Sequence, residues 1–125
     1  MTWTVNNNLR DHAAGVGSVE SAMSGGVLKI YDASDVLLSE HSIGTVSTTA
    51  NVVTVPFNVS TVEAGVTGLT ATKAAIEDSG GSILLSTDNV GLAGADIPFN
   101  DNTGWNAGDS VAPGSATITL TMSVA

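Results

Sequence analysis

The sequence predicts a mainly β protein, an antiparallel β-sandwich of the Ig-like or jelly-roll-like kind with a short N-terminal helix. Three observations predict it: two stretches have the pattern of β-hairpins, short alternating runs are separated by turn residues, and Thr and Val, which favour strands, are common. With 125 residues and no cysteine, the chain is long enough to bury one core without disulfides.

The two predicted hairpins share a pattern. Residues 26–39 read GVLKIYDASDVLLS and residues 75–86 read AIEDSGGSILLS. In each, an apolar run leads into a turn of Asp, Ser or Gly and a second apolar run follows. Aligning Ile30 with Ile76 places Asp32 against Asp78, and one inserted residue is then needed to match the Leu-Leu-Ser triplets. In the first strand of the first hairpin, alternation predicts that Leu28 and Ile30 share one face and that Val27, Lys29 and Tyr31 share the other. We expect the hairpins to be two parts of one sandwich, with no chemistry of their own.

At the N-terminus we expect an arm over residues 1–8, in which residues 3–5 form a short strand or an extended segment. Asn8 is a suitable N-cap for a short helix near residues 9–23, where apolar residues recur every three or four positions. Gly15 and Gly17 weaken this helix by about 1 kcal/mol each relative to Ala. Residues 9–125 are predicted to form a single domain.

The rest of the chain predicts further short strands. Residues 44–51 are interpreted as a connection and residues 60–68 as a loop. Between them, residues 52–59 alternate as a strand does, and Pro56 predicts that this strand lies at an edge or is bulged. Residues 88–114 are Gly-rich and irregular, with a short strand near 97–99, and residues 115–124 form the most regular alternating run.

Few residues are charged, and most of these are acidic: the chain has 12 acidic and 3 basic residues and a formal net charge of -9. A nucleic-acid partner is therefore excluded, because phosphate binding needs clustered Lys and Arg. No apolar run approaches the length of a membrane span, and the first residues lack the pattern of a signal peptide. We expect synthesis in a cytoplasm and no membrane partner.

No set of residues predicts catalysis, so we expect no enzyme, no catalytic residue and no cofactor. His12 and His41 have no Cys or paired carboxylate at a fitting spacing, which favours structural or surface roles. The segment from Gly15 to Val19 lacks the closing Gly of a nucleophile elbow and the full glycine pattern of a dinucleotide loop.

Acidic and Asn residues gather in two regions, and calcium is bound by such oxygen ligands. They are Asp32, Asp35 and Asp78, and then Asp88, Asn89, Asp96, Asn100, Asp101, Asn102 and Asp109. The segment GLAGADI at 91–97 matches part of a calcium-binding nonapeptide, but it occurs once and such repeats act in tandem. Turn formation explains these residues better, and we expect no metal site.

Trp3 and Trp105 stand out because aromatic residues make up only 4% of the chain. Trp is favoured as an anchor at protein interfaces. Trp3 lies near a terminus and Trp105 in a loop rich in Gly and Asn. The alternative is that each tryptophan covers an open end of the chain's own core.

Four segments resemble a group of small virion-associated structural proteins of tailed bacteriophages, related to head decoration or cement proteins. They are WTVNNNLRDH, GGVLKIYDASDVLLSEHSI, LTATKAAIEDSGGSILLSTDNVGLAGADIPFN and SATITLTMSV, at residues 3–12, 25–43, 69–100 and 115–124. They cover nearly the whole chain in order, and none contains a catalytic motif. The chain departs from the family at residues 100–114, where its loop is longer.

The resemblance implies a phage virion structural protein, in the first place a decoration protein bound in many copies to the outer capsid shell. Its partner would be the major capsid protein or another virion protein, with self-association. The arm, residues 1–8, is expected to add a strand to a neighbour's sheet. Trp3, Val5, Leu9 and Trp105 are the expected partner-binding residues.

Two other classes remain open. One is a tail, neck or fibre component of the virion. The other is a carbohydrate-binding or adhesion module, in which Tyr31 and Trp105 would present aromatic surfaces to a glycan.

Overall fold

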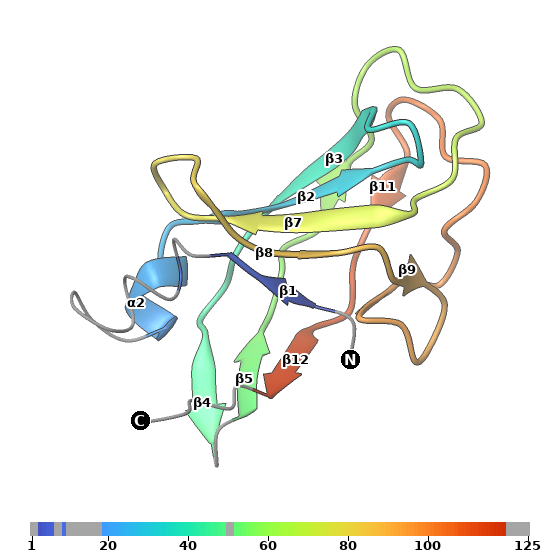
Figure 1. Cartoon of the computed structure of the whole chain (residues 1–125). Helices are drawn as coiled ribbons and strands as arrows, with labels where there is room; N and C mark the ends of the chain where they lie inside the picture. Colours follow the sequence, from blue (N-terminus) through green and yellow to red (C-terminus); the bar gives the residue numbers. More distant parts are fainter. Residues whose placement is uncertain (1–2, 7–8, 10–18, 50–51, 120–125) are drawn as a thin grey trace.

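The computed structural model describes residues 3–6, 9, 19–49 and 52–119 (Figure 1). It is mainly β, with open antiparallel sheets and little helix. In chain order the elements are β1 (Thr4–Val5), α2 (Val19–Met23), β2 (Val27–Tyr31), β3 (Leu37–Ser42), β4 (Ser47–Thr49), β5 (Val52–Val55), β6 (Ser60–Thr61), β7 (Lys73–Glu77), β8 (Ile83–Thr87), β9 (Val90–Gly91), β10 (Ile97–Pro98), β11 (Ser110–Val111) and β12 (Ala116–Thr119).

Five strands form one antiparallel sheet in the order β1-β8-β7-β2-β3 (Figure 1). The two predicted hairpins, β2–β3 and β7–β8, lie side by side because β2 also pairs with β7, with Leu28 opposite Ile76. Along β2, Leu28 and Ile30 are buried, whereas Lys29 and Tyr31 face outward and are half-buried. The hairpins and the two faces predicted for this strand are therefore confirmed.

Both hairpins are closed by the same kind of turn. The carboxylate of Asp32 accepts hydrogen bonds from the backbone N–H groups two and four residues ahead, both at 2.9 Å. The carboxylate of Asp78 does the same in the second hairpin, also at 2.9 Å. The residue three positions after each Asp has a positive φ, 65° at Asp35 and 87° at Gly81. The predicted correspondence of Asp32 with Asp78 is confirmed.

The prediction that one hairpin has an extra residue relative to the other is wrong. The register pairs around the bulge are Ile30–Ser39 and Tyr31–Leu37 in the first hairpin, and Ile76–Leu85 and Glu77–Ile83 in the second. Leu38 and Leu84 are thus the extra residues at the same place in each, and the copies align without a gap. Both leucines are buried, so core packing sets the register rather than the repeated Leu-Leu-Ser letters.

Three strands form a second antiparallel sheet in the order β12-β5-β4. The prediction that Pro56 makes β5 an edge or bulged strand is wrong, because β5 is central and ends at Val55, before the proline. Pro56 therefore removes no hydrogen bond from the ladder. The interpretation of residues 44–51 as a connection missed β4, whose three residues are all exposed and lack the apolar alternation of a half-buried strand.

The segment after β5 joins the two sheets by running back along β3. The backbone hydrogen bonds that fasten it are Gly44 N to Pro56 O at 2.8 Å, Asn58 N to Ser42 O at 3.0 Å, and Glu63 N to Leu38 O at 2.8 Å. The same segment contains β6, which pairs with β11. The strand predicted near residues 97–99 is present as β10, which pairs in parallel with β9.

Side chains from both sheets meet in one hydrophobic cluster. The five-stranded sheet contributes Leu28, Ile30, Ile76 and Leu85, the three-stranded sheet contributes Val53, Val55, Ala116 and Ile118, and the N-terminal region contributes Leu9 and Met23. All of these side chains are almost completely buried. Hydrophobic burial between the sheets, the dominant favourable term in folding, holds them together.

Two predicted elements fall partly outside the described residues. Within the helix predicted near residues 9–23, the structure has α2, five residues long, with Ala22 and Met23 buried. Residues 10–18 are not among those described, so the longer helix stays a prediction. The described part of the alternating run predicted over residues 115–124 contains the strand β12, in which Ala116 and Ile118 are buried and Thr117 is exposed. Residues 120–125 lie outside the described range.

Candidate functional site

Trp105 is an internal packing residue. Its side chain is 3% exposed and lies edge-on to Phe99, with ring centroids 4.9 Å apart and planes at 81°. Its Nε1–H donates to the carbonyl of Asp101 at 2.9 Å. This geometry fits the alternative role, in which Trp105 covers the chain's own core. The indole exposes too little surface to anchor a partner.

Two long loops are fastened together around Trp105. The backbone groups of Leu69 and Trp105 exchange two hydrogen bonds, at 2.9 and 3.2 Å, and Ala71 N donates to Asn102 O at 2.7 Å. Further along, Ala107 N donates to Val66 O at 2.9 Å. The loop over residues 100–114, for which the sequence predicted a greater length than in the proteins that the chain resembles, is thus a structured part of one end of the molecule (Figure 1).

The described part of the predicted N-terminal arm is a strand at the edge of the five-stranded sheet. In β1, Thr4 lies opposite Ser86 and Val5 opposite Leu85. Trp3 and Val5 are half-buried and pack against the core, and Leu9 is 2% exposed within it. Of the four predicted partner-binding residues, Trp3 and Val5 thus sit at a sheet edge, whereas Leu9 and Trp105 are internal.

The indole nitrogen of Trp3 has no hydrogen-bond acceptor in the described part of the chain. This atom, Nε1, is buried. A buried donor without a partner costs about 1–3 kcal/mol. The edge strand is therefore docked against the sheet less favourably than its apolar contacts alone would suggest.

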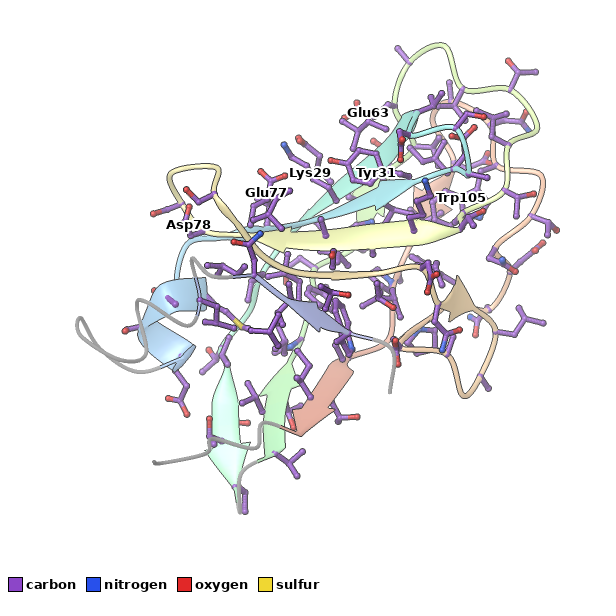
Figure 2. The ribbon with its side chains drawn as sticks, viewed as in Figure 1. Lys29, Tyr31, Glu63, Glu77, Asp78 and Trp105 are labelled. Atoms are coloured by element: carbon purple, nitrogen blue, oxygen red, sulfur yellow. The ribbon has the colours of Figure 1, made fainter. Side chains whose placement is uncertain are left out.

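The outward face of the five-stranded sheet gathers both lysines of the chain. Lys29 Nζ lies 3.1 Å from Glu77 and 3.6 Å from Glu40, and Lys73 Nζ lies 2.9 Å from Asp35. Figure 2 shows Lys29, Tyr31 and Glu77 together on this side of the sheet. We call Lys29, Tyr31, Glu40, Lys73 and Glu77 the outer sheet face. Sequence alternation predicted the orientation of Lys29 and Tyr31, but only the pairing of β2 with β7 brings Lys73 and Glu77 beside them.

Burial distinguishes the ion pairs of the outer sheet face. The Glu77 side chain is 8% exposed, and its hydrogen bond raises the pKa of Lys29 above the usual value. Partial burial likewise raises the pKa of Tyr31. The pair of Lys73 with Asp35 is exposed, and exposed pairs contribute about 0–1 kcal/mol. The pair of Lys29 with Glu77 is therefore the fixed polar feature of this face.

Next to these ion pairs lies an open hollow of about 390 Å³. Its lining residues are Thr4, Tyr31, Asp35, Lys73, Ala74, Ala75, Ser86, Thr87 and Asp88. The small side chains of Ala75 and Ser86 are register partners on β7 and β8 and create the depression. The aromatic ring of Tyr31 and the polar groups of Lys73 and Asp88 border it, which is a combination that can accept a polar ligand or a partner's side chain.

His41 is a buried structural residue. It is 0% exposed, its Nδ1 lies 2.8 Å from the carbonyl oxygen of Asn58, and its Nε2 lies 2.8 Å from Ser39 Oγ. Because a carbonyl can only accept, Nδ1 carries the proton, and in the neutral ring Nε2 accepts from the Ser39 hydroxyl. Burial lowers the pKa of His41. The predicted structural role fits this geometry, and His12 lies outside the described residues.

The carboxylates considered for calcium serve their own turns and loops. Asp101 accepts hydrogen bonds from the backbone N–H and hydroxyl of Thr103, both at 3.0 Å, and the backbone N–H lowers the pKa of Asp101 most. Asp96 accepts from the Thr87 hydroxyl at 2.7 Å. Within the described ranges, no group of three or more His, Asp and Glu side chains is arranged to hold a metal ion.

Comparison with protein-family models, with curated proteins and with solved structures finds no match to this chain. In the part of the chain that the structure describes, no helix is long and apolar enough to cross a membrane.

Proposed function

We propose that this chain is a structural protein of a tailed-phage virion, and in the first place a capsid decoration protein on the outer shell. Its fold would be a β-sandwich of Ig-like or jelly-roll-like type with a short N-terminal helix. The sequence resemblance supports the assignment. So does the use of His41 and of the carboxylates Asp96 and Asp101 in internal hydrogen bonds, which favours a role in adhesion over catalysis.

The observation that carries the proposal is the position of β1. It is a two-residue strand at the edge of the five-stranded sheet, formed by the arm that the sequence predicts to grip a neighbour. An edge strand presents backbone groups that can pair with another chain. Trp3 and Val5, both at this edge, are the predicted partner-binding residues that remain partly accessible.

Charge supports the outer side of the shell. A formal net charge of -9 would repel packaged DNA, whereas an outward-facing protein avoids that repulsion. The mechanism is linkage: a protein that binds only the assembled shell stabilises the assembled state. Many copies make weak individual contacts sufficient. The protein would be made in the cytoplasm of a bacterial host and reside on the capsid surface, in contact with the major capsid protein.

The test compares particles assembled with and without this protein by electron microscopy. The proposal expects surface features on the shell that disappear in its absence, and shells that release DNA at lower temperature. Particles that keep this protein but lack an unrelated non-essential virion protein serve as the control. A normal, equally stable head that lacks a tail or neck feature would instead assign the protein to a tail, neck or fibre component.

A carbohydrate-binding or adhesion module is the second candidate, because the hollow is bordered by Tyr31, which can stack on a sugar ring. Trp105, the other aromatic residue considered for this role, is buried. Binding to a glycan array that Tyr31→Ala abolishes, and Trp105→Phe retains, would favour this candidate.

A further inference from the structure

Among the described residues, the backbone pairing that holds the edge strand β1 to the sheet is short. Two of its residues pair with β8, and a backbone hydrogen bond runs from Asn6 N to Leu84 O at 2.9 Å. The Trp3 side chain adds packing but leaves its buried Nε1 without an acceptor among the described residues. By comparison, the neighbouring pair of β7 and β8 has four register pairs. The sheet can therefore lose β1 while its hairpins stay paired.

The site that β1 occupies fits the alternation of residues in β1. Val5 lies opposite Leu85 and packs against the core, whereas Thr4 lies opposite Ser86 and is exposed. Trp3, on the same side as Val5, also packs against the core. A strand that fits here must alternate large apolar and small polar residues in this order. Residues 3–5 of this chain satisfy this requirement, and every copy carries them.

We propose that β1 is exchanged between copies: residues 3–6 of one copy pair with β8 of a neighbouring copy. The inference identifies the arm's partner as a second copy of this chain, and it rests on the proposed function only for its setting on a shell. The exchanged and closed forms contain the same contacts, so their stabilities are similar and protein concentration decides between them. Copies held close together on a regular surface would have a high effective concentration and favour exchange.

The absence of cysteine in the chain makes thiol cross-linking a clean test. Thr4 and Ser86 are directly opposed on β1 and β8, and opposed strand residues lie within the Cα separation that a disulfide spans. One preparation carries only Thr4→Cys and the other only Ser86→Cys. They are mixed at high concentration, incubated, oxidised mildly and analysed by non-reducing electrophoresis and peptide mass spectrometry. Neither preparation can form an intramolecular disulfide, so a disulfide joining the two positions reports exchange.

The control mixes Thr4→Cys with Ser42→Cys, an exposed position on β3 at the opposite edge of the sheet. Because exchange holds the two thiols at an effective concentration on the order of millimolar, the mixed disulfide should exceed that of the control by at least about tenfold. Equal yields from both mixtures would overturn the inference. The double variant with both Thr4→Cys and Ser86→Cys should form the disulfide within one chain when dilute, which shows that β1 docks as described.

This experiment separates the inference from the proposed function, because it uses purified protein without virions. Exchange without shell binding would leave the inference standing and overturn the decoration role. Shell binding by a protein whose β1 stays in its own chain, at every concentration, would do the reverse. Circular dichroism of each variant checks that the substitutions leave the sheets intact.

Discussion

Lys29 and Ala75 face each other across β2 and β7, and they also occupy equivalent positions in the two hairpins. Asp32 and Asp78 begin the two turns in the same way, and Lys29 and Ala75 each lie three residues before them. The hairpins are thus related by an approximate two-fold axis that passes between Lys29 and Ala75. Unequal side chains at these equivalent positions place a paired cation on one side of the axis and the hollow on the other.

The turn aspartates should contribute similarly to stability. Each carboxylate accepts two backbone hydrogen bonds at 2.9 Å, so Asp32→Ala or Asp78→Ala should each lower the free energy of unfolding by about 1–2 kcal/mol. Urea unfolding followed by circular dichroism measures this. Asp32→Asn and Asp78→Asn keep the acceptor oxygen and should lose less than half as much. A loss of stability in only one of the two alanine variants would contradict the equivalence of the two turns.

The left-handed residue of the second turn should also matter. Gly81 has φ of 87°, a conformation that costs a residue with a side chain about 1–2 kcal/mol, so Gly81→Ala should destabilise the protein by that amount. Its neighbour Gly80 has no positive φ, and a Cβ there would meet Asp78 Oδ1 at 3.4 Å, an ordinary contact. Gly80→Ala is therefore the matched control and should change stability little. Equal losses from both variants would argue against the described turn.

Stability should fall in mildly acidic solution because of His41. An unfolded histidine has a pKa of about 6.5, and burial lowers the pKa of His41 in the folded protein. Below about pH 6.5 the unfolded chain therefore binds more protons, and stability is lost as the pH falls toward the folded pKa. Protonation would also require the Ser39 hydroxyl to stop donating to Nε2. Among the described residues, the aromatic ring that contacts the His41 imidazole is that of Phe99, with the two ring centroids 6.5 Å apart.

The measurement is urea unfolding between pH 7.5 and 5.0, with an NMR titration of the imidazole. We expect the His41 resonance to titrate below pH 6.5. His41→Asn should reduce the dependence of the free energy of unfolding on pH over this range. A His41 resonance that titrates above pH 6.5 would contradict the buried neutral ring.

Local patterns predicted the hairpins well because both the turn and the strands are encoded over short distances. Asp32 and Asp78 bond their own nearby backbone, so the signal lies within five residues. Alternation also predicted which side chains of β2 share a face. The predicted alignment of the two hairpins was wrong at Leu38 and Leu84. A bulge depends on core packing and has no distinct sequence pattern, so alternation alone did not reveal it.

Long-range pairing explains the predictions that failed. β5 became a central strand through β4 and β12, which lie on either side of it along the chain, and Pro56 alone could not reveal that. The candidate site also depends on contacts between distant parts of the chain, which the sequence did not reveal. Composition made Trp105 conspicuous, but its burial depends on Phe99 and on a loop more than thirty residues earlier. The outer sheet face was not predicted, because it exists only once β2 pairs with β7.

The two tryptophans should respond in opposite ways to the same substitution. Trp105→Ala removes a buried ring and should cost about 3–5 kcal/mol, and Trp105→Phe should cost about 1–2 kcal/mol because it leaves the Asp101 carbonyl without its donor. Trp3→Phe removes a buried Nε1–H that has no acceptor in the described structure, so stability should stay the same or rise. Thermal and urea unfolding of the three variants measure these differences. Equal destabilisation by Trp3→Phe and Trp105→Phe would show that the Trp3 indole is satisfied in solution and that β1 is held more firmly than its described contacts indicate.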